Sequence, residues 1–127
     1  MNDSDYEKGM AIRRKSLGGD YVDRATRAAT DFDCDFQELI TRYAWGSVWT
    51  RPGLELAARS LVTISILAAL GREDELRLHL RATRNTGASR DQIREALMHV
   101  AIYAGVPAAN TAFKIAKSVF AELDAEK

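Results

Sequence analysis

The sequence predicts an all-α fold. Alanine and leucine are abundant, and only two prolines, Pro52 and Pro107, interrupt the chain. The strict alternation of apolar and polar residues that marks a half-buried strand is scarce. A chain of 127 residues corresponds to one ordinary domain, so we expect a single helical domain over residues 1–127.

Three helices are expected in the first part of the chain. The first covers residues 5–17 and ends at a Gly-Gly pair, and the second, rich in arginine and alanine, covers residues 21–31. The third covers residues 33–45, where apolar side chains recur every three or four positions along one helix face. These side chains are Phe36, Leu39, Ile40 and Tyr43. We expect Gly46 and the following "WTRPG" segment to break this helix.

The segment "LELAARSLVTISILAALG", residues 54–71, is almost wholly apolar after Ser60. A helix that is apolar on every side belongs in a protein centre or in a subunit interface. Gly71 is expected to cap it, and the next helix then runs through "EDELRLHLRATRNTG" to the turn at residues 85–87.

Two helices are expected near the C-terminus. Ser89 and Gln92 have the spacing of a capping box, which starts a helix over residues 90–104. Gly105 stops this helix, and Pro107 suits the first turn of a last helix that extends to about Leu123.

Composition excludes several function classes. The chain has 18 basic and 18 acidic residues, so its charge gives no general attraction to nucleic acid or to an anionic membrane. No stretch resembles a signal peptide or a membrane span, and we expect a soluble cytoplasmic protein. The single cysteine, Cys34, excludes an intrachain disulfide, a CxxC redox pair and a thiolate zinc site. His79 and His99 lack an obvious third ligand, so neither a metal nor another cofactor is expected.

Residues 87–120 imitate a helix-turn-helix, with a capped helix, a glycine-containing turn and a second helix. A recognition helix should begin with polar and basic groups. This one begins "PAANTAF", and its lysines come only at Lys114 and Lys117. We therefore expect no nucleic-acid binding.

Glu75 and His79 stand four residues apart in a predicted helix, so their side chains share one face. A carboxylate beside an imidazole fixes its tautomer and leaves the other nitrogen to exchange a proton with a ligand. The alternative is an exposed pair of solvated side chains. His99 shares a face with Glu95, and we expect a satisfied core or interface histidine there.

Two arginines and two tryptophans form a second set of candidates. Arg51 precedes an expected helix start, and Arg59 lies inside the apolar helix, where it needs an anion. A glutamate would serve structurally, and a substrate carboxylate would serve functionally. Trp45 and Trp49 flank a glycine, and such aromatics belong either to a core or interface or to a pocket wall.

The segments "RYAWGSVWTRPGL", "RSLVT", "REDELRLHLRA" and "AIYAGVPAAN" resemble the gamma-carboxymuconolactone decarboxylase family of the alkyl hydroperoxidase D-like superfamily. The resemblance extends from "EKGMAIRRKSLG" to "SVF", nearly the whole chain. It implies a bundle of about six to seven helices, assembled into trimers or hexamers. It also implies cofactor-free decarboxylation of 4-carboxymuconolactone to β-ketoadipate enol-lactone, in the protocatechuate branch of aromatic catabolism.

The resemblance also implies roles for the candidate residues. Arg51 and Arg59 would hold the carboxylates of the dicarboxylate lactone, and His79, oriented by Glu75, would donate the proton. Trp45 or Trp49 would supply an apolar wall. The peroxidase branch carries a CxxC pair before its histidine, whereas this chain reads "GREDELRL", so thiol peroxidase activity is not expected.

Two positions depart from relatives that carry an acidic residue at Ser60 and a cysteine at Ala88. Two alternative functions stay open: a decarboxylase or isomerase acting on a related lactone, and a non-catalytic oligomeric stress or binding protein with the same fold. An enzyme would need a pocket holding the histidine and the arginines, whereas a scaffold would bury them in ion pairs.

Overall fold

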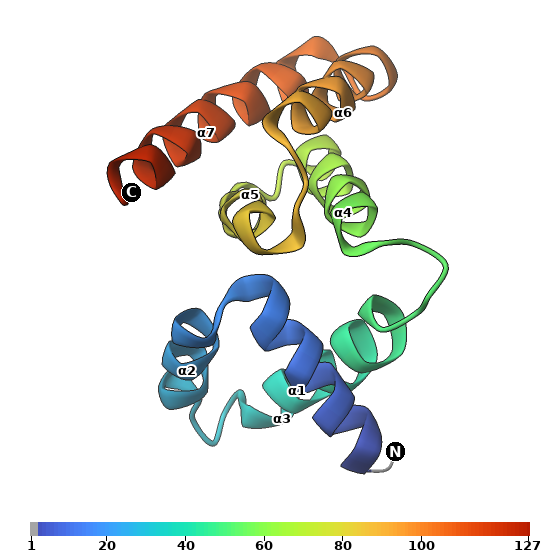
Figure 1. Ribbon diagram of the computed structural model, residues 1–127, viewed down its shortest axis with the longest axis vertical. Helices are drawn as coiled ribbons and strands as arrows, with labels where there is room; N and C mark the ends of the chain where they lie inside the picture. Colours follow the sequence, from blue (N-terminus) through green and yellow to red (C-terminus); the bar gives the residue numbers. More distant parts are fainter. Residues whose placement is uncertain (1–2) are drawn as a thin grey trace. The chain divides into compact units, whose positions relative to one another are not determined.

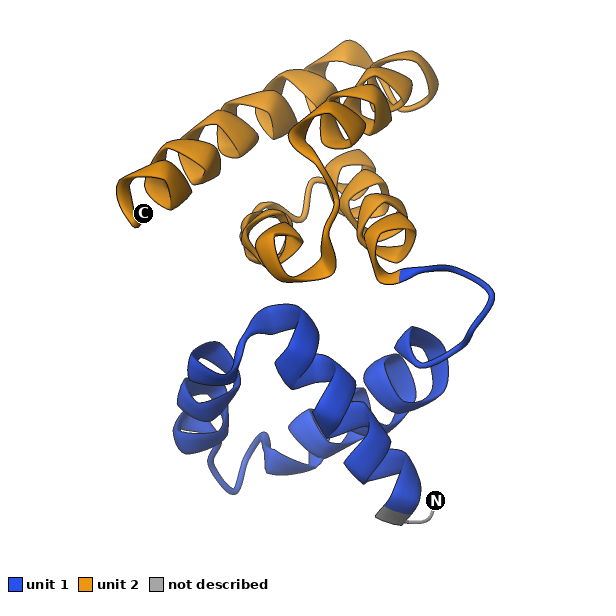
Figure 2. Cartoon of the chain, in the orientation of Figure 1, with its two compact units in different colours: residues 1–55 blue, residues 56–127 orange. Residues whose placement is uncertain are grey.

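The computed structural model describes residues 3–127 and contains only helices there (Figure 1), which confirms the all-α prediction. The helices are α1 (Asp3–Leu17), α2 (Gly19–Ala28), α3 (Cys34–Ile40), the π-helix η1 (Thr41–Trp49), α4 (Leu56–Leu70), α5 (Glu73–Thr86), α6 (Arg90–Tyr103) and α7 (Val106–Ala125). Figure 2 colours two compact units, residues 1–55 and 56–127. The expectation of one domain stays a prediction, and each unit is described by itself.

In the first unit, α1 packs mainly against η1. Two glycines allow this contact, because a Cβ on Gly46 would lie 2.5 Å from the Asp5 carbonyl oxygen and a Cβ on Gly9 would overlap the Thr41 carbonyl. The prediction that Gly46 breaks a helix is wrong: α3 passes into η1, which continues through Gly46 to Trp49. Glycine costs a helix only about 1 kcal/mol, so a close backbone crossing outweighs it.

The boundaries of α2 also differ from the prediction. Gly18 has a positive φ of 94° and separates α1 from α2, but Gly19 already belongs to α2. The helix ends at Ala28 because Ala29 is extended. The expected 21–31 helix therefore begins earlier and ends earlier.

The second unit has a continuous apolar core formed by α4, α5, α6 and α7. Its most deeply buried large side chains are Ile64, Leu76, Leu80, Ile93, Leu97 and Val119. The predicted turn signals are confirmed: Gly87 ends α5 in the left-handed region, and Ser89 and Gln92 form the capping box of α6. Gly105 and Pro107 begin α7 as expected.

Helix α4 carries apolar residues on opposite faces. One face buries Ser60, Ile64 and Ala68 in the second unit. The other exposes a stripe of three side chains at the same spacing: Val62, Ile66 and Leu70, each about half exposed or more. The sequence prediction left open a protein centre or an interface, and the second unit by itself buries one face of this helix.

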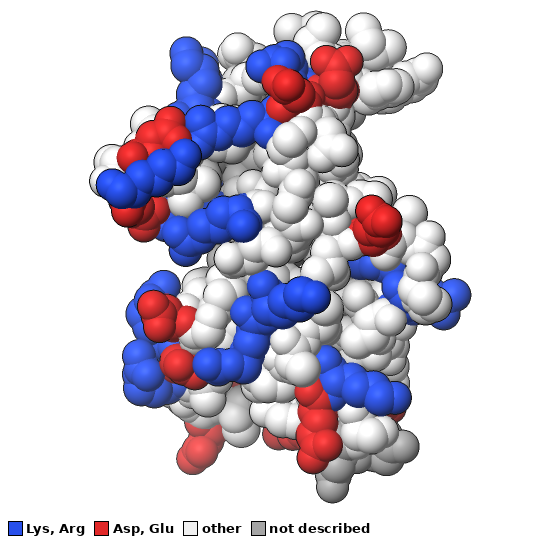
Figure 3. All heavy atoms as spheres, viewed as in Figure 1, with Lys and Arg blue, Asp and Glu red and all other residues white. Residues whose placement is uncertain are grey.

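The surface charges are mixed. On the face drawn in Figure 3, Lys and Arg side chains lie beside Asp and Glu side chains. Ion pairs account for much of this pattern in the second unit, where Arg77 contacts Glu122 at 3.1 Å and Arg81 contacts Glu126 at 2.9 Å. Within residues 3–127, no helix is long and apolar enough to cross a membrane.

Candidate active site

Helix α5 positions the central pair of candidates, Glu75 and His79. Leu76 and Leu80 are buried in the core, which fixes how the helix faces the rest of the second unit. Glu75 lies in the first turn, where a carboxylate is favoured by the helix dipole, and it is exposed. His79 follows one turn later and is half-buried.

Burial dominates the electrostatics of His79. It lowers the pKa of the imidazole from its ordinary value of 6.5 to about 4, and the negative charge of Glu75 opposes this shift without cancelling it. His79 is therefore neutral at pH 7 in the ligand-free protein. A neutral imidazole keeps one N–H that can donate a hydrogen bond and one nitrogen that can accept a proton.

A buried hydroxyl pair joins α4 to α5. Ser60, which is fully buried, donates a hydrogen bond of 2.7 Å to Thr86 Oγ1. Thr86 follows His79 by seven residues, which is two helical turns, so both side chains lie on the same face of α5. In the sequence Ser60 stands out only as a departure from relatives, and its pairing with Thr86 is not predicted. No local pattern could have revealed it, because the partners are 26 positions apart.

Arg59 directly precedes Ser60 on α4. Its residue is half-buried and its Nε is inaccessible to solvent. A guanidinium held this way keeps its charge and retains a fixed fork of donors. Arg59 lies in the second unit, as do Glu75 and His79, so this unit contains three of the six predicted site residues.

The other three predicted residues belong to the first unit. Trp45 and Trp49 lie one turn apart on η1, with ring centroids 4.7 Å apart and planes tilted by 31°. Both are more than nine-tenths buried, so the structure gives them a core role, and a role as pocket wall stays a prediction. Arg51 follows η1 and is exposed. The structure thus brings together the two tryptophans, and separately the Glu75–His79 pair.

His99 does not lie in the core. It is exposed on α6 and stacks on Tyr103 with ring centroids 6.0 Å apart, so the core half of the prediction is wrong. Its neighbours Met98 and Ile102 are also exposed, which leaves an interface as the open alternative.

Comparison with known proteins assigns the chain to a family. The profile of the Carboxymuconolactone decarboxylase family matches residues 35–118. A 4-carboxymuconolactone decarboxylase from Acinetobacter baylyi is 50% identical over 124 residues, which cover 97% of this chain and 92% of that protein. The chain belongs to the carboxymuconolactone decarboxylase family.

Membership in the carboxymuconolactone decarboxylase family confirms the resemblance given above. A 4-carboxymuconolactone decarboxylase from Pseudomonas putida is 49% identical over 41 residues, or 32% of this chain and 85% of that sequence. The nitrosuccinic acid decarboxylase npaB from Metarhizium robertsii is 44% identical over 102 residues, or 80% of this chain and 71% of that protein. All six predicted site residues lie within the range that the family profile matches.

Proposed function

We propose that the protein decarboxylates 4-carboxymuconolactone to β-ketoadipate enol-lactone without a cofactor, acting as a carboxy-lyase of aromatic catabolism in the cytoplasm. The observation that carries the proposal is the 50% identity over 97% of the chain to the Acinetobacter baylyi enzyme. The Glu75–His79 pair on α5, with its strongly lowered imidazole pKa, supplies a chemical group suited to the reaction.

The substrate explains why no cofactor is needed. Its departing carboxylate lies on a ring carbon next to a double bond, and that double bond is conjugated to the lactone carbonyl. When the carbon–carbon bond breaks, its electron pair flows toward the carbonyl oxygen and forms a dienolate. The protein must then bind two carboxylates, stabilise the oxygen's negative charge and return a proton to the ring.

His79 can stabilise the negative charge on the oxygen and return the proton to the ring. Because the imidazole is neutral at pH 7, its N–H is available to donate a hydrogen bond to the developing oxyanion. A bound dicarboxylate places negative charge nearby, which raises the pKa of His79 and favours transfer of a proton to the ring carbon. Glu75 acts in the same direction and orients the ring.

The arginines are proposed to bind the two carboxylates of the substrate. Arg59, which directly precedes the buried Ser60 on α4, is proposed to hold one carboxylate, and Arg51 the other. The two arginines should not both hold the departing group tightly, because strong ground-state binding of that carboxylate would slow its loss, so one of them should hold the acetate arm instead. Trp45 and Trp49 are proposed to form an apolar wall that favours expulsion of neutral carbon dioxide.

The test is turnover of carboxymuconolactone, generated in situ, by the wild-type protein, His79→Ala and the matched control His99→Ala. We expect His79→Ala to lower kcat at least about 10²-fold, because general acid–base groups contribute about 10²- to 10⁴-fold. The control should retain activity. An inactive wild type would refute the proposed substrate, and equal rates for both variants would remove His79 from the mechanism.

A second candidate substrate is nitrosuccinate, which the 44% identity to the Metarhizium robertsii decarboxylase favours. Its chemistry is parallel, since a nitro group takes up the electron pair that carbon dioxide leaves behind. Measuring kcat/KM for both substrates on the same enzyme preparation separates the two candidates.

The active form is proposed to be a homo-oligomer, a trimer or hexamer. The exposed stripe of Val62, Ile66 and Leu70 on α4 supports this assembly, because such contiguous apolar surface marks interaction sites. Light scattering coupled to gel filtration should show a smaller particle for Ile66→Glu. Phe32→Glu, at an exposed position of the first unit, is the matched control and should leave the mass unchanged.

A further inference from the structure

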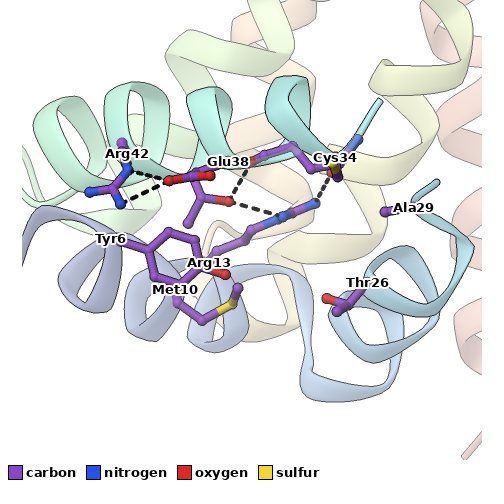
Figure 4. Close-up of a pocket in the computed structure, with 10 residues that line it drawn as sticks. Tyr6, Met10, Arg13, Thr26, Ala29, Cys34, Glu38 and Arg42 are labelled. Carbon is purple, nitrogen blue, oxygen red and sulfur yellow. Dashed lines mark hydrogen bonds and ion pairs between the residues drawn. The ribbon is translucent and has the colours of Figure 1, made fainter. Parts of the chain in front are cut away.

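The first unit contains a cavity that the proposed reaction does not use. Its volume is about 470 Å³, which is within the range of small-molecule sites. Helices α1, α3 and η1 and the C-terminal end of α2 border it, and Figure 4 shows the side chains that line it. They include Tyr6, Met10, Arg13, Ala29, Cys34, Gln37 and Thr41.

Arg13 is the unusual member of this lining. It reaches from α1 toward α3 (Figure 4), and only 5% of the residue is exposed. Its Nη1 and Nη2 donate to Thr41 Oγ1 and Gln37 Oε1, both at 3.3 Å, and its buried Nε has no hydrogen-bond partner among the described residues. These bonds are longer than the usual range of about 2.7–3.2 Å. The guanidinium is therefore only loosely satisfied.

The positive charge of Arg13 also lacks a counter-charge among the described side chains. Glu38, the one carboxylate in the lining, accepts from Arg42 Nε at 3.0 Å and from Arg42 Nη2 at 2.9 Å. Thr41 and Gln37 are neutral. An arginine stays protonated when buried, so an uncompensated guanidinium at this position favours an anion in the cavity.

The remaining lining indicates what kind of anion fits. Met10 and Ala29 present apolar surface. The Arg42 guanidinium lies over the Tyr6 ring, with its Cζ 5.4 Å from the ring centroid. The cavity thus offers one unneutralised cation and an apolar remainder. Inorganic anions are too small and too polar to use both features, whereas an organic acid with one carboxylate matches them.

We propose that this cavity binds a small organic monocarboxylate, with the carboxylate on the Arg13 guanidinium and the apolar body against Met10, Ala29 and Tyr6. The carboxylate oxygens replace the long contacts to Thr41 and Gln37 with charge-assisted hydrogen bonds. The site lies wholly in residues 1–55, whereas the Glu75–His79 pair belongs to the second unit.

The chain carries its own reporter for this site. Cys34 is the only cysteine, it is exposed, and it lines the same cavity. A ligand in the cavity covers the thiol and slows its alkylation. Iodoacetamide is uncharged, so its reaction rate does not respond simply to the charge of an added anion.

The experiment measures the rate of Cys34 alkylation by intact-mass spectrometry, with benzoate, benzamide or inorganic phosphate added at millimolar concentration. Benzamide has the same shape as benzoate without the charge, and phosphate has the charge without the apolar body. We expect saturating benzoate to slow alkylation of the wild type at least about threefold, and the other two compounds to have no effect. The variants are Arg13→Gln and, as the matched control, Arg14→Gln, which removes the neighbouring exposed arginine of α1, whose partner Asp23 lies on α2.

Protection by benzoate in the wild type and Arg14→Gln but not in Arg13→Gln supports the proposal. Three results overturn it: no protection of the wild type, equal protection by benzamide or phosphate, or undiminished protection in Arg13→Gln. The comparison of the three compounds on the wild type needs no variant, so it decides the matter even if Arg13→Gln fails to fold.

Discussion

The lowered pKa of His79 leads to a direct prediction. In a His99→Gln background, His79 is the only imidazole, and its Cε1 proton can be followed by NMR from pH 3.5 to 8. We expect a midpoint at about pH 4, because burial removes the charged form more strongly than Glu75 stabilises it. At pH 7 about one molecule in a thousand then carries an imidazolium at this position.

The same shift has a thermodynamic consequence whose sign can be worked out. Below pH 6.5 the His79 imidazole is protonated in the unfolded chain, whereas in the folded chain it stays neutral down to about pH 4. The free energy of unfolding therefore decreases as the pH falls. One pH unit corresponds to about 1.4 kcal/mol, so the interval from 6.5 to 4 gives a limiting loss of about 3.5 kcal/mol. At pH 4.5 we expect about 2.5 kcal/mol of it to have been lost.

The assay is urea unfolding at pH 7 and pH 4.5, at one protein concentration, for His99→Gln and for the double variant His99→Gln/His79→Gln. Other groups titrate in both proteins and cancel in the comparison, so the double variant should lose about 2.5 kcal/mol less between the two pH values. An equal loss in both proteins, or an NMR midpoint near 6.5, would refute the reasoning that burial keeps His79 neutral.

Three further substitutions test the packing. Gly46→Ala should destabilise the protein by more than about 2 kcal/mol in urea unfolding, because its Cβ meets the Asp5 carbonyl oxygen at 2.5 Å. Ser60→Ala should cost about 1–3 kcal/mol by the same measurement, since it leaves the buried Thr86 hydroxyl without its donor. Ser89→Ala should cost about 1 kcal/mol and reduce hydrogen-exchange protection in the first turn of α6, because it removes the capping box.

Local signals in the sequence were sufficient for most of the second unit. The cap at Ser89, the glycine at position 87 and the proline at 107 act within a few residues, and the structure confirms each of them. The Glu75–His79 spacing is equally local, because a helix alone places both side chains on one face.

Features that depend on distant partners could not be predicted in this way. The local sequence indicates a helix break at Gly46. The real reason for this glycine is its close contact with Asp5, which is far away in the chain and leaves no local signal. The burial that lowers the pKa of His79 and the burial of Arg13 likewise come from tertiary packing, which periodicity does not report. The joint use of Arg51 and Arg59 stays a prediction, since they belong to different compact units.

The crossing of α1 and η1 at Gly9 and Gly46 has a genetic consequence. Glycine is the only residue without a Cβ, so every missense change at either codon adds an atom where a carbonyl oxygen already stands. Neither position offers a mild allele, although neither contributes a side chain to a core or to a reaction. In a deep mutational scan, both codons should therefore be as intolerant as those of the proposed catalytic residues Glu75 and His79, and intolerance alone would misidentify them as part of an active site.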